Sequence, residues 1–165
     1  MNLPMTSAPR TLIKVGISEM AVSRDPDVQI VTYALGSCIG LVLYDPRRRC
    51  AGLLHYQLPS SKGKQNVNPA MYADTGIPLL FQSMYDQGCR KSDIVVKVAG
   101  GANINDATGV FDIGKRNYLI LRKMLWKNDV LIASEDVGGA HPRTVRVDVA
   151  TGNVWVQTGR VSKEL

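Results

Sequence analysis

The chain has 165 residues, of which 45% are hydrophobic and 21% are charged, a balance typical of a globular protein with one domain. No apolar run approaches the roughly eighteen residues that a membrane-spanning helix needs, and residues 1–11 contain no apolar stretch typical of a signal peptide, so we expect a cytoplasmic protein without membrane insertion. The net charge of +6 fits an acidic protein partner, whereas nucleic acid is disfavoured because the aromatic residues, 6% of the chain, do not alternate with the basic ones.

The first predicted elements are short strands rich in β-branched residues. Residues 11–16 and 28–34 carry such runs, and residues 39–44 and 50–56 follow the same pattern. Between the last two lies Asp45-Pro46-Arg47-Arg48, whose Asp-Pro order is typical of a type I turn. The sequence therefore predicts a β-hairpin here.

A cysteine and a histidine flank this hairpin. If Asp45 pairs with Arg48 across the turn, the same register pairs Cys38 directly with His55. Directly opposed residues have Cβ atoms roughly 4.5–5.5 Å apart, close enough for the thiol–imidazole pair that a cysteine nucleophile requires. We therefore expect His55 to lower the pKa of the Cys38 thiol. The preceding Gly36-Ser37 allows a sharp turn that exposes backbone N–H groups.

The other two cysteines, Cys50 and Cys89, are expected to be small buried residues. Three cysteines without a C-x-x-C motif predict neither a zinc site nor a disulfide framework. We therefore expect no metal, no cofactor and reduced thiols.

Two amphipathic helices are predicted in the second half of the chain. The first has Thr75 as its N-cap, carries an apolar face with helical spacing and ends at Gly88. The second spans residues 113–128, and its first turn contains Lys115 and Arg116. Cations there oppose the helix dipole, so these two residues are candidates for substrate binding, the alternative being a solvated pair.

A buried strand over residues 94–99 ends in Gly100-Gly101. The spacing matches neither a dinucleotide-binding nor a phosphate-binding loop, so we interpret these glycines as a close backbone approach beside the site and as substrate-binding candidates. Further strands are predicted at residues 130–134, 144–149 and 154–158.

These elements predict one domain over residues 1–165, with residues 1–10 as a flexible N-terminal segment. Seven to nine strands and two main helices indicate an α+β fold built in layers.

Several motifs follow one another in a fixed order along the chain. They are Thr32, Leu35-Gly36-Ser37-Cys38, His55-Tyr56-Gln57-Leu58-Pro59, Tyr72-Ala73-Asp74, Ile77-Pro78-Leu79-Leu80, Gly100-Gly101-Ala102, Ile113-Gly114-Lys115-Arg116-Asn117, Glu135-Asp136-Val137-Gly138-Gly139 and Thr151-Gly152. This series, which covers nearly the whole chain, resembles the CheD family of bacterial chemoreceptor glutamine deamidases.

The resemblance implies a catalytic group in which Cys38 is the nucleophile, His55 its base and Thr32 the third member. It implies mixed sheets packed as a β-sandwich and flanked by helices, similar to the cysteine deamidases of the cytotoxic necrotizing factor type. The implied substrates are glutamine side chains on the cytoplasmic helices of chemoreceptors. The implied regulatory partner is the CheC phosphatase, which would compete with receptors for the same face.

The chemistry itself is that of acyl transfer, in which a base takes the thiol proton and the thiolate attacks a carbonyl carbon. Backbone N–H groups near Gly36 and Ser37 are candidates for an oxyanion hole. Two alternatives stay open: a non-catalytic chemotaxis module that binds CheC or receptors, and a receptor methylesterase.

Overall fold

The computed structural model describes residues 10–104 and 111–165. Of the N-terminal segment expected to be flexible, only Arg10 is described, and its guanidinium forms an ion pair with Asp148. Among the described helices, none has the length and apolar character needed to cross a membrane.

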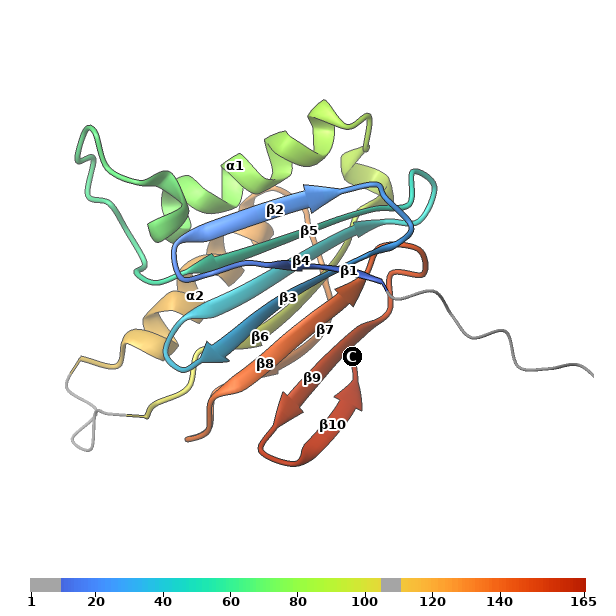
Figure 1. The fold of residues 1–165 in the computed structure, drawn as a ribbon. Helices are drawn as coiled ribbons and strands as arrows, with labels where there is room; N and C mark the ends of the chain where they lie inside the picture. Colours follow the sequence, from blue (N-terminus) through green and yellow to red (C-terminus); the bar gives the residue numbers. More distant parts are fainter. Residues whose placement is uncertain (1–9, 105–110) are drawn as a thin grey trace, which may run out of the picture.

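Two five-stranded sheets form most of the described structure (Figure 1). The first has the order β1 (Thr11–Lys14), β3 (Val28–Leu35), β8 (Arg143–Asp148), β9 (Val154–Thr158) and β10 (Val161–Glu164). The second has the order β2 (Glu19–Ser23), β5 (Cys50–Tyr56), β4 (Ile39–Asp45), β6 (Val95–Gly100) and β7 (Ile132–Val137). Both sheets are mixed, because β1 runs parallel to β3 and β6 runs parallel to β7.

Two helices, α1 (Ala73–Asp86) and α2 (Ile113–Lys127), cover one face of the second sheet (Figure 1). Two short 3₁₀ helices, Pro69–Met71 and Lys91–Asp93, accompany them. Strands β4 and β5 are buried along their whole length because they lie between two cores. Leu41 and Leu54 pack toward the helices, whereas Val42 and Leu53 pack toward the first sheet.

This architecture confirms the predicted α+β fold with layered mixed sheets. The predicted number of strands, seven to nine, was too low, because the described residues form ten strands. The structure adds β2 and β10, both at sheet edges, which the sequence pattern did not indicate.

The predicted start of the first helix was wrong. Helix α1 begins at Ala73, and Thr75 lies inside its first turn, where its hydroxyl donates to the carbonyl of Pro69. The predicted end is confirmed: Gly88 has a φ of 89°, and the N–H groups of Gly88 and Cys89 donate to the carbonyls of Tyr85 and Met84.

The predicted hairpin register was also wrong. Asp45 pairs with Cys50 and not with Arg48, so four residues form the turn. The carboxylate of Asp45 accepts hydrogen bonds from the backbone N–H groups of Arg47 and Arg48, and Arg49 closes the turn with a φ of 48°. The register differs by two residues from the prediction, and a shift of two leaves every side chain on the same face of the sheet.

Candidate active site

Cys38 lies in the short connection between β3 and β4, at one end of the two-sheet core. The connection follows an irregularity in β3 between Thr32 and Leu35, where Ala34 adopts a φ of 56°. A bulge of this kind bends a strand and redirects the chain that follows. The Cys38 side chain is half-buried and packs against the core between the sheets.

Three consecutive carbonyl groups in this connection accept hydrogen bonds on the side away from solvent. The carbonyl of Gly36 accepts from the N–H of Ala102, that of Ser37 from the side chain of Asn117, and that of Cys38 from the N–H of Gly101. In a trans peptide the N–H points opposite to the carbonyl, so the N–H groups of Ser37 and Cys38 point away from these partners. An oxyanion hole needs N–H groups that are not used inside the protein, so its predicted place at these two groups stays a prediction.

His55 lies near the end of β5, and its imidazole points toward the first sheet. The Oγ1 atom of Thr32 on β3 lies 2.7 Å from its Nδ1, and both side chains are fully buried. Gly40 lies directly opposite His55 on β4, and a Cβ built there would come within 2.8 Å of the Leu35 side chain. The absence of a side chain at this position therefore lets the Leu35 side chain of β3 pack directly against β4.

The hydrogen bonds of Thr32 determine which nitrogen of His55 carries the proton. Thr32 Oγ1 also lies 2.7 Å from the carbonyl oxygen of Val15, which can only accept. Because a hydroxyl has one proton, Thr32 donates to Val15 and accepts from Nδ1–H of His55. The neutral imidazole is therefore unprotonated at Nε2, a buried atom with no hydrogen-bond partner among the described residues.

The predicted direct pairing of Cys38 with His55 was wrong, because the ladder between β4 and β5 begins at Ile39 and Cys38 lies just before it. Gly40 is the residue opposite His55, and Cys38 precedes it by two residues, with its side chain packed against the same core between the sheets toward which the His55 ring points. Diagonal cross-strand neighbours are roughly 7–8 Å apart at Cα and closer at Cβ. The unprotonated Nε2 thus lies on the same side of the sheet as the thiol.

The pKa values of this pair differ from the sequence-based expectation. Burial raises the pKa of the Cys38 thiol, and a hydrogen bond involving its own backbone offsets only part of this. Burial also lowers the pKa of His55 to about 4, while the Glu19 carboxylate acts weakly in the opposite direction. The expected lowering of the thiol pKa was therefore wrong: both shifts favour the neutral form, a thiol at Cys38 and an uncharged imidazole at His55.

A pocket of about 410 Å³ opens at the thiol. One wall consists of the connection from Ala34 to Cys38, and the opposite wall comes from the segment after β6 and the start of α2. Ile104 and Phe111 line it and are 41% and 70% exposed, so the mouth of the pocket is partly apolar.

The other predicted site residues lie close to this pocket. Lys115 and Arg116 are exposed on the first turn of α2, next to Ile113 and Gly114, which line the pocket. Gly100 lies behind the thiol: it has a φ of 110°, and a Cβ there would come within 2.3 Å of the Cys38 carbonyl oxygen. Gly101 also lies behind the connection, so the predicted close backbone approach is confirmed, whereas their role in substrate binding stays a prediction.

Three residues of the site, Val15, Asn117 and Phe111, were not among the candidates predicted from the sequence. Val15 supplies the carbonyl that fixes the Thr32 hydroxyl, and a backbone contact of this kind leaves no signal in sequence. Asn117 and Phe111 did leave one: Asn117 is a polar residue on the buried stripe of α2, and Phe111 is a large apolar residue in a polar region.

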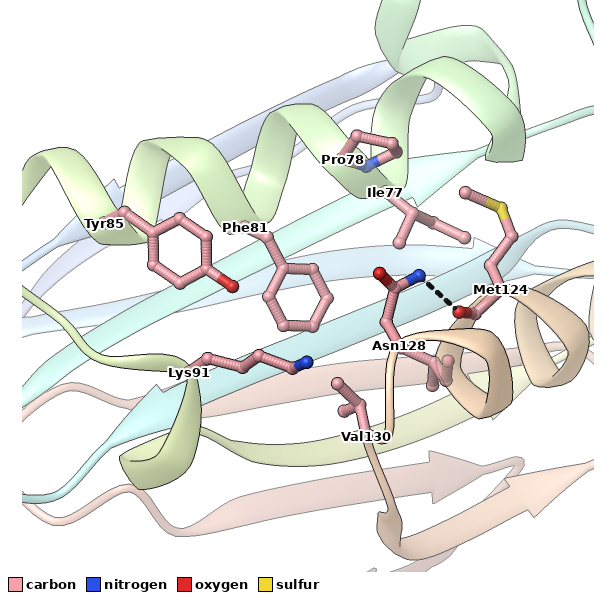
Figure 2. A pocket seen from close by; sticks show the side chains of 9 residues that line it. Ile77, Pro78, Phe81, Tyr85, Lys91, Met124, Asn128 and Val130 are labelled. Carbon is pink, nitrogen blue, oxygen red and sulfur yellow. Dashed lines mark hydrogen bonds between the residues drawn. The ribbon is translucent and has the colours of Figure 1, made fainter.

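A second pocket, of about 250 Å³, lies between α1 and α2 (Figure 2). Its walls are mainly apolar, from Ile77, Phe81 and Val130, and the Lys91 amine is its cation. The described residues that line it include neither Cys nor His, so it offers no nucleophile–base pair. Nor does the described part of the chain contain a cluster of three metal-ligating side chains.

Comparison with known proteins gives a consistent set of relatives. A family model described as CheD chemotactic sensory transduction matches residues 57–158. The chain is 47% identical to the probable chemoreceptor glutamine deamidase CheD of Solibacter usitatus, over 93% of this chain and 92% of the relative. It is 50% identical to the probable chemoreceptor glutamine deamidase CheD 1 of Syntrophus aciditrophicus, over 87% of this chain and 92% of the relative.

Among solved structures, the hypothetical protein YfiH of Bacillus licheniformis is similar at 13% identity with a TM-score of 0.44. The alignment covers 73% of this chain and 49% of that one.

Proposed function

The chain belongs to the CheD family, and on that premise we propose that it deamidates glutamine side chains of bacterial chemoreceptors with Cys38 as the nucleophile. The observation that supports this most strongly is the hydrogen-bond chain from Val15 through Thr32 to His55. It leaves the Nε2 lone pair of His55 on the face that carries the thiol.

The proposed first half-reaction begins when His55 Nε2 takes the proton of the Cys38 thiol. The sulfur attacks the carboxamide carbon of a glutamine in the same step, and the resulting oxyanion accepts from the N–H groups of Ser37 and Cys38. Collapse of this intermediate breaks the C–N bond. His55 returns its proton to the leaving nitrogen, so ammonia departs and a thioester remains.

The second half-reaction is hydrolysis of this thioester. His55 Nε2 takes a proton from water, the hydroxide attacks the thioester carbon, and the C–S bond breaks. Glutamate is released and the proton returns to the sulfur of Cys38. Because burial keeps the resting pair neutral, we expect the thiol proton to move to His55 as the sulfur attacks the carboxamide carbon, without a stable thiolate beforehand.

The proposed substrate is a glutamine on a helix of the cytoplasmic region of a chemoreceptor, which places the reaction in the cytoplasm. The partly apolar mouth and the cations Lys115 and Arg116 suit a helix that presents apolar and acidic residues. The CheC phosphatase is the proposed competitor for this same face.

Product mass distinguishes this activity from its alternatives. A purified receptor fragment would be incubated with the protein and its intact mass followed with time. Deamidation adds about one dalton per site, whereas hydrolysis of a glutamate methyl ester removes about fourteen. A mass that stays constant would identify a binding module, and a loss of mass an esterase; either result would contradict the proposal.

A further inference from the structure

We propose that Asn117 is a positioning residue that clamps the nucleophile connection to the base strand, an inference that rests on the proposed function. Asn117 lies on α2 and is 0% exposed. Its side-chain amide donates to two carbonyl oxygens, that of Ser37 at 2.9 Å and that of Gln57 at 3.0 Å. One acceptor directly precedes Cys38, and the other follows His55 by two residues.

The orientation of the Asn117 amide follows from its partners. Both oxygens near Nδ2 are carbonyl oxygens, which cannot donate, so the NH₂ group must face them. A carboxylate of the same shape would present an acceptor to two acceptors. The site therefore requires an amide at this position and not merely a side chain of its size.

The backbone around Asn117 is anchored as well. Its carbonyl oxygen accepts from the hydroxyl of Tyr56, the neighbour of His55, at 2.7 Å. One turn earlier, a Cβ built at Gly114 would come within 2.6 Å of the Gly101 carbonyl oxygen, so α2 begins in direct contact with the segment behind Cys38. The start of α2 is thus fixed against both catalytic segments.

This placement gives Asn117 an influence on the chemistry without contact with the substrate. Its bond to the Ser37 carbonyl sets the plane of the Ser37–Cys38 peptide and therefore the direction of the Cys38 N–H. Its bond to Gln57 sets the distance between the Cys38 connection and β5. Loss of one oxyanion donor typically lowers kcat by about 10²–10³, and misplacement by about 1 Å has a similar effect.

The test compares Asn117→Ala and Asn117→Asp with Tyr44→Phe as a matched control. The Tyr44 hydroxyl also contacts two backbone carbonyl oxygens, those of Val149 and Ala150, but at the opposite end of β4. Three quantities are measured for each protein: the melting temperature, kcat and KM on a receptor fragment, and the rate at which iodoacetamide alkylates Cys38.

We expect each Asn117 variant to lower kcat by about a hundredfold while KM changes by less than about threefold. We expect Cys38 alkylation to accelerate in the same variants, because a released connection exposes the thiol. Tyr44→Phe should lower the melting temperature by a comparable amount, but it should change neither kcat nor the alkylation rate of Cys38. If the Asn117 variants lose activity only as far as the control does, the clamp has no catalytic role and the proposal is overturned.

Two further outcomes keep the test decisive. If Asn117→Asp does not fold, Tyr56→Phe is used in its place, because it removes only the hydrogen bond to the backbone carbonyl of Asn117. This variant should lower kcat by less than the Asn117 variants do. An unchanged kcat counts against the clamp. If the wild-type protein leaves the fragment unmodified, the proposed function fails. The clamp is then judged by alkylation alone, and equal rates in wild type and Asn117→Ala overturn it.

Discussion

Replacing Thr32 by Val removes the hydroxyl that links Val15 to His55 and preserves the shape of the side chain. Two buried groups then lose their partner, the Nδ1–H of His55 and the carbonyl of Val15. Each buried polar group left unsatisfied costs about 1–3 kcal/mol, so the free energy of unfolding should fall by about 2–6 kcal/mol. The tautomer of His55 is no longer fixed, and kcat should fall by about 10²–10⁴.

Thr32→Ser is the matched control because it keeps the hydroxyl and removes one methyl group. It should cost about 0.5–1.5 kcal/mol and retain most of the activity. Urea unfolding gives the stability, intact-mass kinetics on a receptor fragment give kcat, and ¹⁵N NMR of the imidazole gives the tautomer. If Thr32→Val keeps wild-type kcat and the Nδ1–H tautomer, the inferred role of the hydrogen-bond chain is refuted.

Three other predictions follow from the site. Iodoacetamide should alkylate Cys38 faster than Cys50 and Cys89, because Cys38 is only half-buried whereas the other two are buried. The alkylation rate of Cys38 should keep rising above pH 8.5, because burial raises the pKa of its thiol. A rate that is already maximal at pH 7 would contradict this. The pKa of His55 is about 4, so between pH 6.5 and 4 the unfolded chain binds a proton that the folded protein does not. The free energy of unfolding should therefore fall by up to about 3 kcal/mol as the pH drops through this window. Urea unfolding of His55→Gln should lack this part of the pH dependence. Reversing Lys115 and Arg116 to Glu should lower kcat/KM on intact receptor by at least about tenfold at low salt without changing Cys38 alkylation; equal processing across salt concentrations would show a solvated pair.

The sequence was sufficient to predict the fold class and the faces of the central strands. Strand β8 alternates apolar and polar residues from Thr144, and β4 and β5 carry apolar runs typical of strands covered on both faces. Helix α2 was predicted to within one residue of its end because its apolar stripe has helical spacing. Strand β10 was missed because all its residues are exposed, so its pairing with β9 imposes no pattern.

The geometry of the site was predictable only in part. Residues 38 and 55 were placed on one face correctly because a two-residue error in register conserves the face. The register itself depends on Asp45, whose carboxylate accepts two backbone N–H groups and so favours a longer turn than Asp-Pro alone suggests. The pKa of Cys38 could not be predicted, because it depends on burial by residues distant in sequence.

The most direct test of the central claim is the intact mass of a receptor fragment after incubation with wild-type protein, Cys38→Ala and Cys38→Ser. Circular dichroism and thermal unfolding of the three proteins serve as controls for the fold. Wild type should add about one dalton per modified glutamine, whereas both variants should leave the mass unchanged and keep a folded spectrum. Continued conversion of Gln to Glu by Cys38→Ala would show that the thiol is not the nucleophile and would contradict the mechanism.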